Sequence, residues 1–208
     1  MNPIPSPRAG GPAAAACALA AALTVMPPTD AAAQQIIEDL RPVRFFAGFG
    51  LTAGGDRLAT ARYRYYRDES VHAGGLLQLH AGIEFRMAPG VTGALSAGYH
   101  ADGTSGWRGS YSFDRWPIEA LAHVAVAPRW RVGGGARLVL NPRLRSDGDF
   151  PDVNERFKNA LGGVVEVEYR FTDLIGLKLR GVAERYKSKQ ALPSADGNHV
   201  GLVMNFYF

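Results

Sequence analysis

Residues 199–208 read HVGLVMNFYF, and this stretch decides the fold. Every second residue is apolar: Val200, Leu202, Met204, Phe206 and Phe208. The residues between them are smaller or more polar. Alternation with a period of two over about ten residues predicts one β-strand that crosses a lipid bilayer at a tilt. A single strand cannot do so, because its unpaired N–H and C=O groups would lie in hydrocarbon. The rest of the chain is therefore expected to supply the other strands of a closed barrel.

Seven further segments alternate in the same way. In each of them, an apolar face opposes a face that is small, polar or charged. Together with the last segment they make eight: residues 43–52, 77–87, 91–100, 115–126, 130–141, 161–171, 175–184 and 199–208. The sequence thus predicts an all-β protein, an eight-stranded antiparallel up-and-down transmembrane β-barrel.

The connections between these segments alternate in length. Residues 88–90, 127–129 and 172–174 predict tight turns, whereas 54–71, 101–113, 142–159 and 187–198 predict long loops. Short turns on one side and long loops on the other are typical of outer-membrane barrels, whose long loops lie outside the cell. Aromatic residues fall near both ends of the segments, as membrane interfaces require. The aromatics expected at the periplasmic rim are Phe45, Phe85, Trp130, Tyr169, Phe171, Phe206 and Phe208. Those expected at the extracellular rim are Tyr99 and Trp116.

Pro117 conflicts with this pattern, because proline cannot donate to a strand ladder, and it predicts a bulge or a rim position. Residues 58–66 alternate as well and could extend the first hairpin beyond the membrane. A soluble β-sandwich or lipocalin-like barrel is the competing fold, with its apolar faces turned inward. The continuous apolar face and the two aromatic rims favour the membrane barrel.

The N-terminus has the pattern of a secretory signal peptide. Arg8 precedes an Ala-rich apolar run, Ala13–Met26, and Ala31–Ala33 offers a cleavage site. We therefore expect a cleaved signal peptide at 1–33 and one barrel domain at 34–208, which contains no cysteine. No later segment is apolar for long enough to predict a transmembrane helix. The formal net charge of +4 could suggest nucleic acid as a partner, but export argues against it.

At this point the chain resembles the small eight-stranded outer-membrane barrels of Gram-negative bacteria, the OmpA-like, OmpX-like and OmpW-like group. The signal peptide, the eight segments and the ending Asn205-Phe206-Tyr207-Phe208 carry the resemblance, which covers the whole mature chain. In that group, a terminal Phe after alternating aromatics is the signal read by the barrel-assembly machinery, and Phe206 and Phe208 match it. The peptidoglycan-binding domain of full-length OmpA proteins is expected to be absent.

The expected inner face is the richest set of ionisable groups. It has Glu84, Glu119, Glu166, Glu168 and Glu184 against Arg86, Arg131, Arg137, Arg170, Lys178 and Arg180. Eight strands enclose an interior just wide enough for side chains to fill. Opposite charges should therefore pair there and form a polar plug. The alternative is a narrow or gated pore, in which some of these pairs exchange partners.

The loops contain three further groups of reactive residue types. His72 lies near Asp68, Glu69 and Ser70, and His100 lies near Asp102 and Ser105. Neither group has a recognised catalytic motif, and a triad is defined by geometry, so we predict no enzyme. Residues 146–155 form an acidic loop that could bind calcium. Its spacing departs from the EF-hand pattern, so we predict a solvated loop with no metal and no cofactor.

Basic and aromatic residues of the first long loop suit the phosphates of lipopolysaccharide at the membrane surface. The basic residues are Arg57, Arg62, Arg64 and Arg67. We therefore expect a monomeric barrel with a structural or surface-interaction role, in contact with outer-membrane lipid and lipopolysaccharide. The first alternative is a small pore or hydrophobic-solute conduit of the OmpW-like kind. The second is an enzyme that modifies lipid A.

Overall fold

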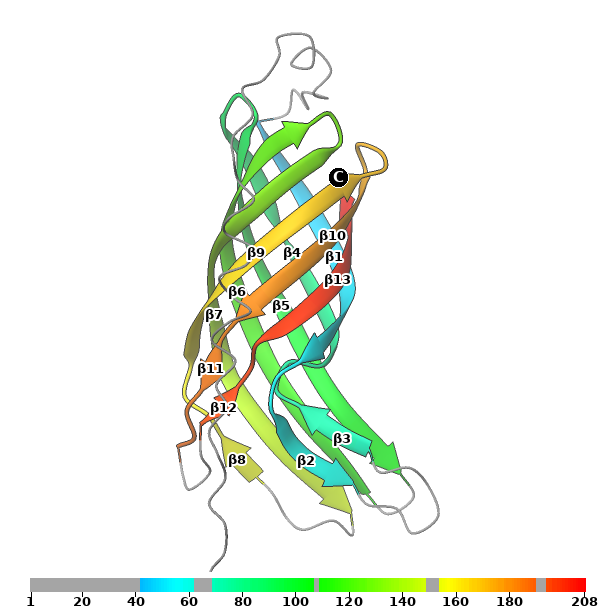
Figure 1. The fold of residues 1–208 in the computed structure, drawn as a ribbon, viewed down its shortest axis with the longest axis vertical. Helices are drawn as coiled ribbons and strands as arrows, with labels where there is room; N and C mark the ends of the chain where they lie inside the picture. The colour runs from blue at the N-terminus through cyan, green and yellow to red at the C-terminus, as the bar shows by residue number, and fades with distance from the viewer. Residues whose placement is uncertain (1–41, 62–68, 107–108, 149–153, 190–193) are drawn as a thin grey trace, which may run out of the picture.

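The computed structural model describes residues 42–61, 69–106, 109–148, 154–189 and 194–208. Within these ranges, eight antiparallel strands close one barrel (Figure 1). They are β1 (Val43–Gly54), β4 (Leu76–Ala88), β5 (Val91–Gly106), β6 (Gly109–Ala127), β7 (Trp130–Gly148), β9 (Ala160–Arg170), β10 (Ile175–Ala183) and β13 (His199–Tyr207). The predicted fold class is confirmed, and the eight strands correspond to the eight alternating segments. In the described part of the chain, no helix has the length and apolar character needed to cross a membrane.

The barrel closes where the first and last strands meet. β1 pairs with β4 on one side and with β13 on the other, so Gly48 lies between His80 and Asn205. A Cβ at Gly48 would lie 2.2 Å from Oδ1 of Asn205, so the side chains opposite fill the space that this glycine leaves. Each of the eight strands pairs with two neighbours, so the ring of strands is closed.

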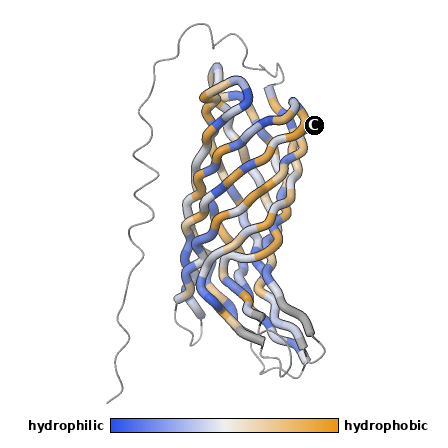
Figure 2. Tube along the Cα trace, turned by 45° about the vertical axis from the view of Figure 1, so that its right-hand side comes forward, coloured by the Kyte–Doolittle hydropathy of each residue, from blue (hydrophilic) through white to orange (hydrophobic). Residues whose placement is uncertain are grey.

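Burial alternates along the strands, with the apolar side chains outside. In β13, Val200 and Leu202 are 60% and 52% exposed, whereas Val203 and Asn205 are fully buried. The tube in Figure 2 shows the same alternation of hydrophobic and hydrophilic positions along the strands. A soluble barrel requires the opposite arrangement, so the competing soluble fold is wrong.

The connections differ at the two ends of the barrel. Tight turns join β4 to β5, β6 to β7 and β9 to β10 at the end where the chain terminates, at the top of Figure 1. The opposite, long-loop end has the short strands β2 (Arg57–Ala61), β3 (Glu69–His72), β8 (Asn154–Arg156), β11 (Arg185–Tyr186) and β12 (Ala195–Asp196). β2 pairs with β3, so the first loop does form an additional hairpin.

Two of the predicted long loops are wrong in part, because strands continue through them. β5 and β6 stay paired as far as Gly106 and Gly109, and β6 and β7 as far as Gly148. The sequence criterion required an apolar outer face, and that face ends before the ladders do. The barrel therefore has a belt half, with an apolar outer wall up to Tyr99 and Trp116, and a loop half beyond these residues.

A bulge in β7 marks the junction of the two halves. Between the pairs Trp116–Leu140 and Asp114–Arg143, β7 advances three residues while β6 advances two. The extra residue lies next to Asn141, whose φ of 48° is in the left-handed region that Asn tolerates. Pro117 lies inside β6 and is buried, so the expected irregularity is in the neighbouring strand rather than at the proline.

Candidate functional site

Charged side chains of the belt half gather inside the barrel because they occupy the inward positions of its strands. Most of the expected residues are buried there: Glu84, Glu119, Arg131, Arg137, Glu166, Glu168, Lys178, Arg180 and Glu184. An isolated buried charge is costly, so the pairing of these groups decides what the lumen can do.

At the tight-turn end, the charges surround the phenol of Tyr207. Glu84 pairs with Arg44 at 2.6 Å and with Arg131 at 2.7 Å, and Arg131 also pairs with Glu168. Nη2 of Arg131 donates to the Tyr207 hydroxyl at 2.6 Å, and that hydroxyl donates to Glu168 at 2.5 Å. The phenol thus joins a cation to a carboxylate, and every group of the cluster has a partner of opposite charge or polarity.

The central layer of the lumen is built on Glu166. Its Oε1 accepts from Nζ of Lys178 at 2.5 Å and contacts Nε2 of His123 at 2.6 Å. Its Oε2 lies 3.7 Å from Nε of Arg180. One carboxylate therefore connects β6, β9 and β10 across the interior.

Arg137 continues the network toward the loop half. Its guanidinium pairs with Glu119 at 2.5 Å and with Glu184 at 3.0 Å, and Glu119 also accepts from Arg180 at 2.7 Å. Tyr186 donates its hydroxyl to Glu184. Burial and the neighbouring Glu184 raise the pKa of Tyr186, so this hydroxyl keeps its proton.

The buried charges of this network balance. Five carboxylates (Glu84, Glu119, Glu166, Glu168 and Glu184) face five cations (Arg44, Arg131, Arg137, Lys178 and Arg180). In all of the ion pairs above, both side chains are at most 8% exposed. Removal of one partner from such a pair costs about 3 to 5 kcal/mol, so the arrangement favours a fixed network over mobile charges.

Two residues expected in the network lie outside it. Arg86 is exposed, and Arg170 lies over the Tyr207 ring at 4.9 Å and donates to the backbone carbonyl of Asp173. Two others were missed: Arg44 forms an ion pair with Glu84, and the His123 ring contacts the Glu166 carboxylate, both from inward positions. Their inward parity was visible in the sequence and could have identified them.

Between the network and the interior of the loop half, the Arg115 guanidinium contacts the rings of His100 and Phe113. Arg115 is fully buried and donates to Nδ1 of His100 at 2.9 Å and to the carbonyl of Gly75 at 3.1 Å. Nε2 of the same ring lies 2.8 Å from Oγ1 of Thr52. The Arg115 guanidinium lies 4.9 Å from the ring of Phe113, where the apolar interior begins.

The interior of the loop half is apolar. Phe113, Phe157 and Tyr186 meet edge to face, with ring centroids 5.5 to 6.2 Å apart. They belong to a buried cluster that fills the loop half: Val71, Ala73, Tyr111, Phe113, Val139, Leu144, Phe157, Ala160, Tyr186 and Ala195. The sequence predicted a polar lumen, and this second, apolar core was not expected.

The histidines singled out as catalytic candidates form no triad among the described residues. The His100 ring contacts Arg115 and Thr52, whereas the carboxylate of Asp102 accepts from the backbone N–H of His72 at 2.6 Å. Asp68 and the side chains of Glu69 and Ser105 lie outside the described residues. The described part of the chain also has no group of three potential metal ligands.

The remaining candidate residues lie near the long-loop end and the tight-turn end of the barrel. Arg57 is exposed on β2, whereas Arg62, Arg64 and Arg67 lie outside the described residues. The acidic loop is described only in part, since residues 149–153 lie outside, and Glu155 turns inward to accept from Ser188. Phe206 stacks on Phe49 at 6.2 Å, and Phe208 is 63% exposed at the tight-turn end.

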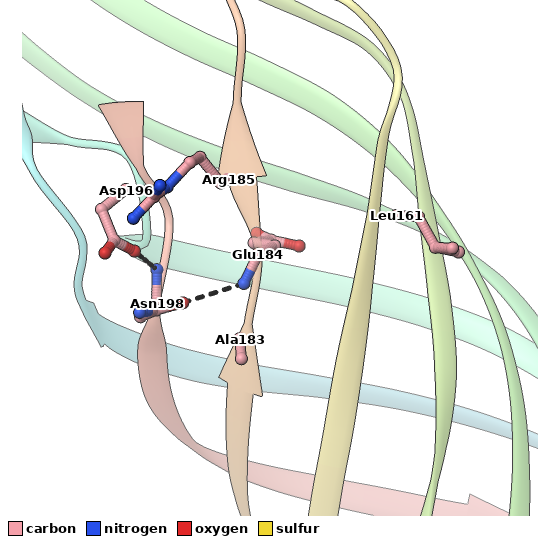
Figure 3. Close-up of a pocket in the computed structure, with 6 residues that line it drawn as sticks. All are labelled: Leu161, Ala183, Glu184, Arg185, Asp196 and Asn198. Atoms are coloured by element: carbon pink, nitrogen blue, oxygen red, sulfur yellow. Dashed lines mark hydrogen bonds between the residues drawn. The ribbon is translucent and has the colours of Figure 1, made fainter. Parts of the chain in front are cut away.

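A hollow of about 260 Å³ interrupts the wall beside β11 and β12 (Figure 3). The backbone N–H of Glu184 donates to Oδ1 of Asn198 at 2.9 Å, and the backbone N–H of Asn198 donates to Asp196 at 3.0 Å. Leu161 lies on the opposite side of the hollow. The side chains of Asn198 and Asp196 thus bond to the backbone of the hollow.

Comparison with known proteins supports the fold. Neither a scan of family models nor a search of curated proteins finds a match. Among solved structures, Neisserial surface protein A is similar, with a TM-score of 0.51 and 12% identity over 81% of this chain and 98% of that one. Ail of Yersinia pestis, in a complex with a heparin analogue, gives a TM-score of 0.49 and 11% identity over 80% and 97%. OprG of Pseudomonas aeruginosa gives 0.35 and 10% over 80% and 94%.

Proposed function

We propose that this protein is an outer-membrane β-barrel with a structural or surface-interaction role, a plugged lumen and four extracellular loops. The observation that carries this proposal is the combination of an apolar outer wall with a balanced, buried charge network inside. The fold shared with Neisserial surface protein A supports it, because that structure has the same small-barrel architecture.

The dimensions of the belt half suit a bilayer. A transmembrane β-strand needs about 9 to 11 tilted residues, and β9, β10 and β13 have 11, 9 and 9. Their outward apolar residues, such as Leu179 and Leu202, are more than half exposed. Burial of this surface in lipid would stabilise the barrel, whereas in water it would promote aggregation.

A plugged lumen accounts for the interior better than a pore. The charge network fills the belt half and the apolar cluster fills the loop half, so a hydrated ion would have to displace both. In the first alternative, a small pore or hydrophobic-solute conduit, Arg137 would have to leave Glu119 and Glu184. That exchange would expose two buried carboxylates, which is expensive.

An enzymatic role lacks a catalytic arrangement in the described residues. Guanidinium groups of Arg115 and Arg137 both contact Nδ1 of His100, so the lone pair of this nitrogen is not free to take a proton. A general base needs a free acceptor. Mass spectrometry of lipid A from cells with and without the protein tests this second alternative. New or missing acyl chains would replace the proposal by an enzyme.

The expected partners are outer-membrane lipid and lipopolysaccharide, with the barrel-assembly machinery during biogenesis. Exposed Arg57 lies on the β2–β3 hairpin of the first loop, where the other three loop arginines were also expected to meet lipopolysaccharide. Reversal of Arg57, Arg62, Arg64 and Arg67 to Glu should weaken lipopolysaccharide contact. An unchanged contact would remove this loop from the proposal.

Single-channel recording tests the plug. The purified, folded protein in planar bilayers should give no conductance steps, and the sample should migrate differently on a detergent gel before and after boiling. The variant E119S/R137S/F113A/F157A removes side chains from both the charge network and the apolar cluster and serves as the control that opens a path. Conductance of the wild-type protein would favour the pore. Identical migration of boiled and unboiled samples would contradict the membrane-barrel fold.

A further inference from the structure

The outer wall of the loop half has an unusual concentration of positive charge. Arg143 and Arg145 of β7, Arg156 of β8 and Lys189 form this surface, which we call the basic wall. Arg143 lies directly opposite Arg156 in the β7–β8 ladder. The backbone N–H of Lys189 donates to the carbonyl of Arg156 at 3.0 Å, which places the lysine beside it.

The bulge at Asn141 creates the basic wall. In the belt half, the odd-numbered residues of β7 face inward, as Arg131, Arg137 and Val139 do. The extra residue reverses this parity, so Leu144 turns inward while Arg143 and Arg145 turn outward. A fold without the bulge would direct these two arginines into the lumen.

The charge of the basic wall is not neutralised within the described residues. None of its four cations forms an ion pair there, and Arg143 donates to the uncharged amide oxygen of Asn154 at 2.9 Å. Asp114, which lines the pocket beside these cations, already accepts from the Tyr99 hydroxyl at 2.5 Å. Like charges directly opposite in a ladder are destabilising, so this arrangement does not serve stability alone.

The basic wall borders a pocket of about 250 Å³. Trp116, Asp114 and Pro142 also line this pocket. A water molecule occupies about 30 Å³ of liquid, so the pocket has room for an anionic group several times that size. Guanidinium groups bind phosphate oxygens in pairs, and three of the four cations are arginines.

The height of the pocket identifies the source of the anion. Trp116 packs on Tyr99 at 5.0 Å, and this aromatic pair ends the apolar wall. Trp and Tyr side chains lie at the headgroup level of a membrane. The exposed side chains next in line toward the belt, Ile118 and Leu138, are apolar. The pocket thus lies at the level of lipid phosphates.

We propose that the basic wall binds the phosphate groups of lipid A in the outer leaflet. This inference rests on the proposed function, which places the loop half outside the cell. Arg143, Arg145, Arg156 and Lys189 supply the positive charge, and Trp116 contacts the lipid beneath the headgroup. The site differs from the first-loop arginines, because it is on the outer wall formed by β6, β7 and β8.

The test compares two pairs of arginine substitutions that remove the same charge. R143Q/R156Q alters the basic wall, and R86Q/R129Q alters exposed arginines at the tight-turn end. Native mass spectrometry of the folded protein in detergent measures the affinity for diphosphorylated, monophosphorylated and dephosphorylated lipid A. Each cation removed should weaken binding about fivefold, so R143Q/R156Q should lose about 25-fold while R86Q/R129Q stays near the wild type.

Three results would overturn the inference: equal losses in the two double variants, equal binding of dephosphorylated lipid A, or displacement of lipid A by equimolar inorganic phosphate. The last result would assign the pocket to a soluble anion. Both variants should keep the migration shift on boiling, which shows that they are folded. Failure of the wild-type protein to insert into bilayers would count against the proposed function. If the wild-type protein inserts but R143Q/R156Q binds lipid A as well as the wild type does, only the lipid A site on the basic wall is refuted.

Discussion

The belt half and the loop half have opposite insides. In the belt half, β7 turns Arg137 inward and Leu138 outward, and in the loop half the same strand turns Leu144 inward and Arg145 outward. In our proposal lipid surrounds the first half and water the second, so the apolar side chains are outside in one and inside in the other. The hydrophobic effect thus acts on both halves, and the level at which the pattern inverts marks the membrane boundary.

Loss of a charge from the belt-half network should have the largest effect. R137M leaves Glu119 and Glu184 without their shared cation, and we expect a loss of about 3 to 5 kcal/mol in the free energy of unfolding. Denaturant unfolding in lipid vesicles measures this. R145M is the matched control, because Arg145 is exposed in the loop half, and its effect should stay within about 0.5 kcal/mol. Equal effects of the two variants would refute the contrast between the halves.

The apolar core of the loop half should behave like that of a soluble protein. Leu144 is 1% exposed within the cluster, and L144A should lower the free energy of unfolding by about 3 kcal/mol through lost burial and a cavity. Its control is L161A, because Leu161 is 75% exposed on the belt wall. That substitution should cost less than about 1 kcal/mol in vesicles, since lipid replaces the lost contacts. A larger loss for L161A would contradict the assignment of water and lipid.

Charges introduced on the outer wall should locate the boundary between the halves. V165R places a cation near the middle of the belt and should cost about 2 to 3 kcal/mol in vesicles. L161R lies two outward positions closer to the loop half and should cost about 1 kcal/mol or less, because the cost falls toward the interface. A cost that does not change along β9 would mean that the apolar wall is not lipid-facing.

The sequence predicted the belt half well and the loop half poorly, for a physical reason. Apolar outward residues such as Leu202 and Val165 repeat with a period of two, and the charges between them follow by parity. In the loop half the outer face is polar, so residues 101–113 and 142–148 resembled loops although their ladders continue.

The basic wall could not be predicted because it depends on one inserted residue. Parity counted from Arg137 directs Arg143 inward, and only the bulge beside Asn141 reverses it. The dipeptide Asn141-Pro142 was the available signal, since Asn favours positive φ and proline interrupts a ladder. The bond from Arg115 to the carbonyl of Gly75 was equally inaccessible, because it joins β6 to the residue before β4, and β5 lies between these two strands.

The smallest effect on stability is expected at the free end of the belt half. The Phe208 side chain is 63% exposed, and its backbone N–H donates to the carbonyl of Phe45 at 2.9 Å. F208A keeps that backbone bond, so its free energy of unfolding in vesicles should change by less than about 1 kcal/mol. If Phe208 is the signal for the assembly machinery, the amount of folded barrel in cells should fall even so. F171A is the control, because Phe171 is a similarly exposed aromatic of the same rim. Equal yields of the two variants in cells would show that Phe208 contributes as a rim aromatic and not as a signal.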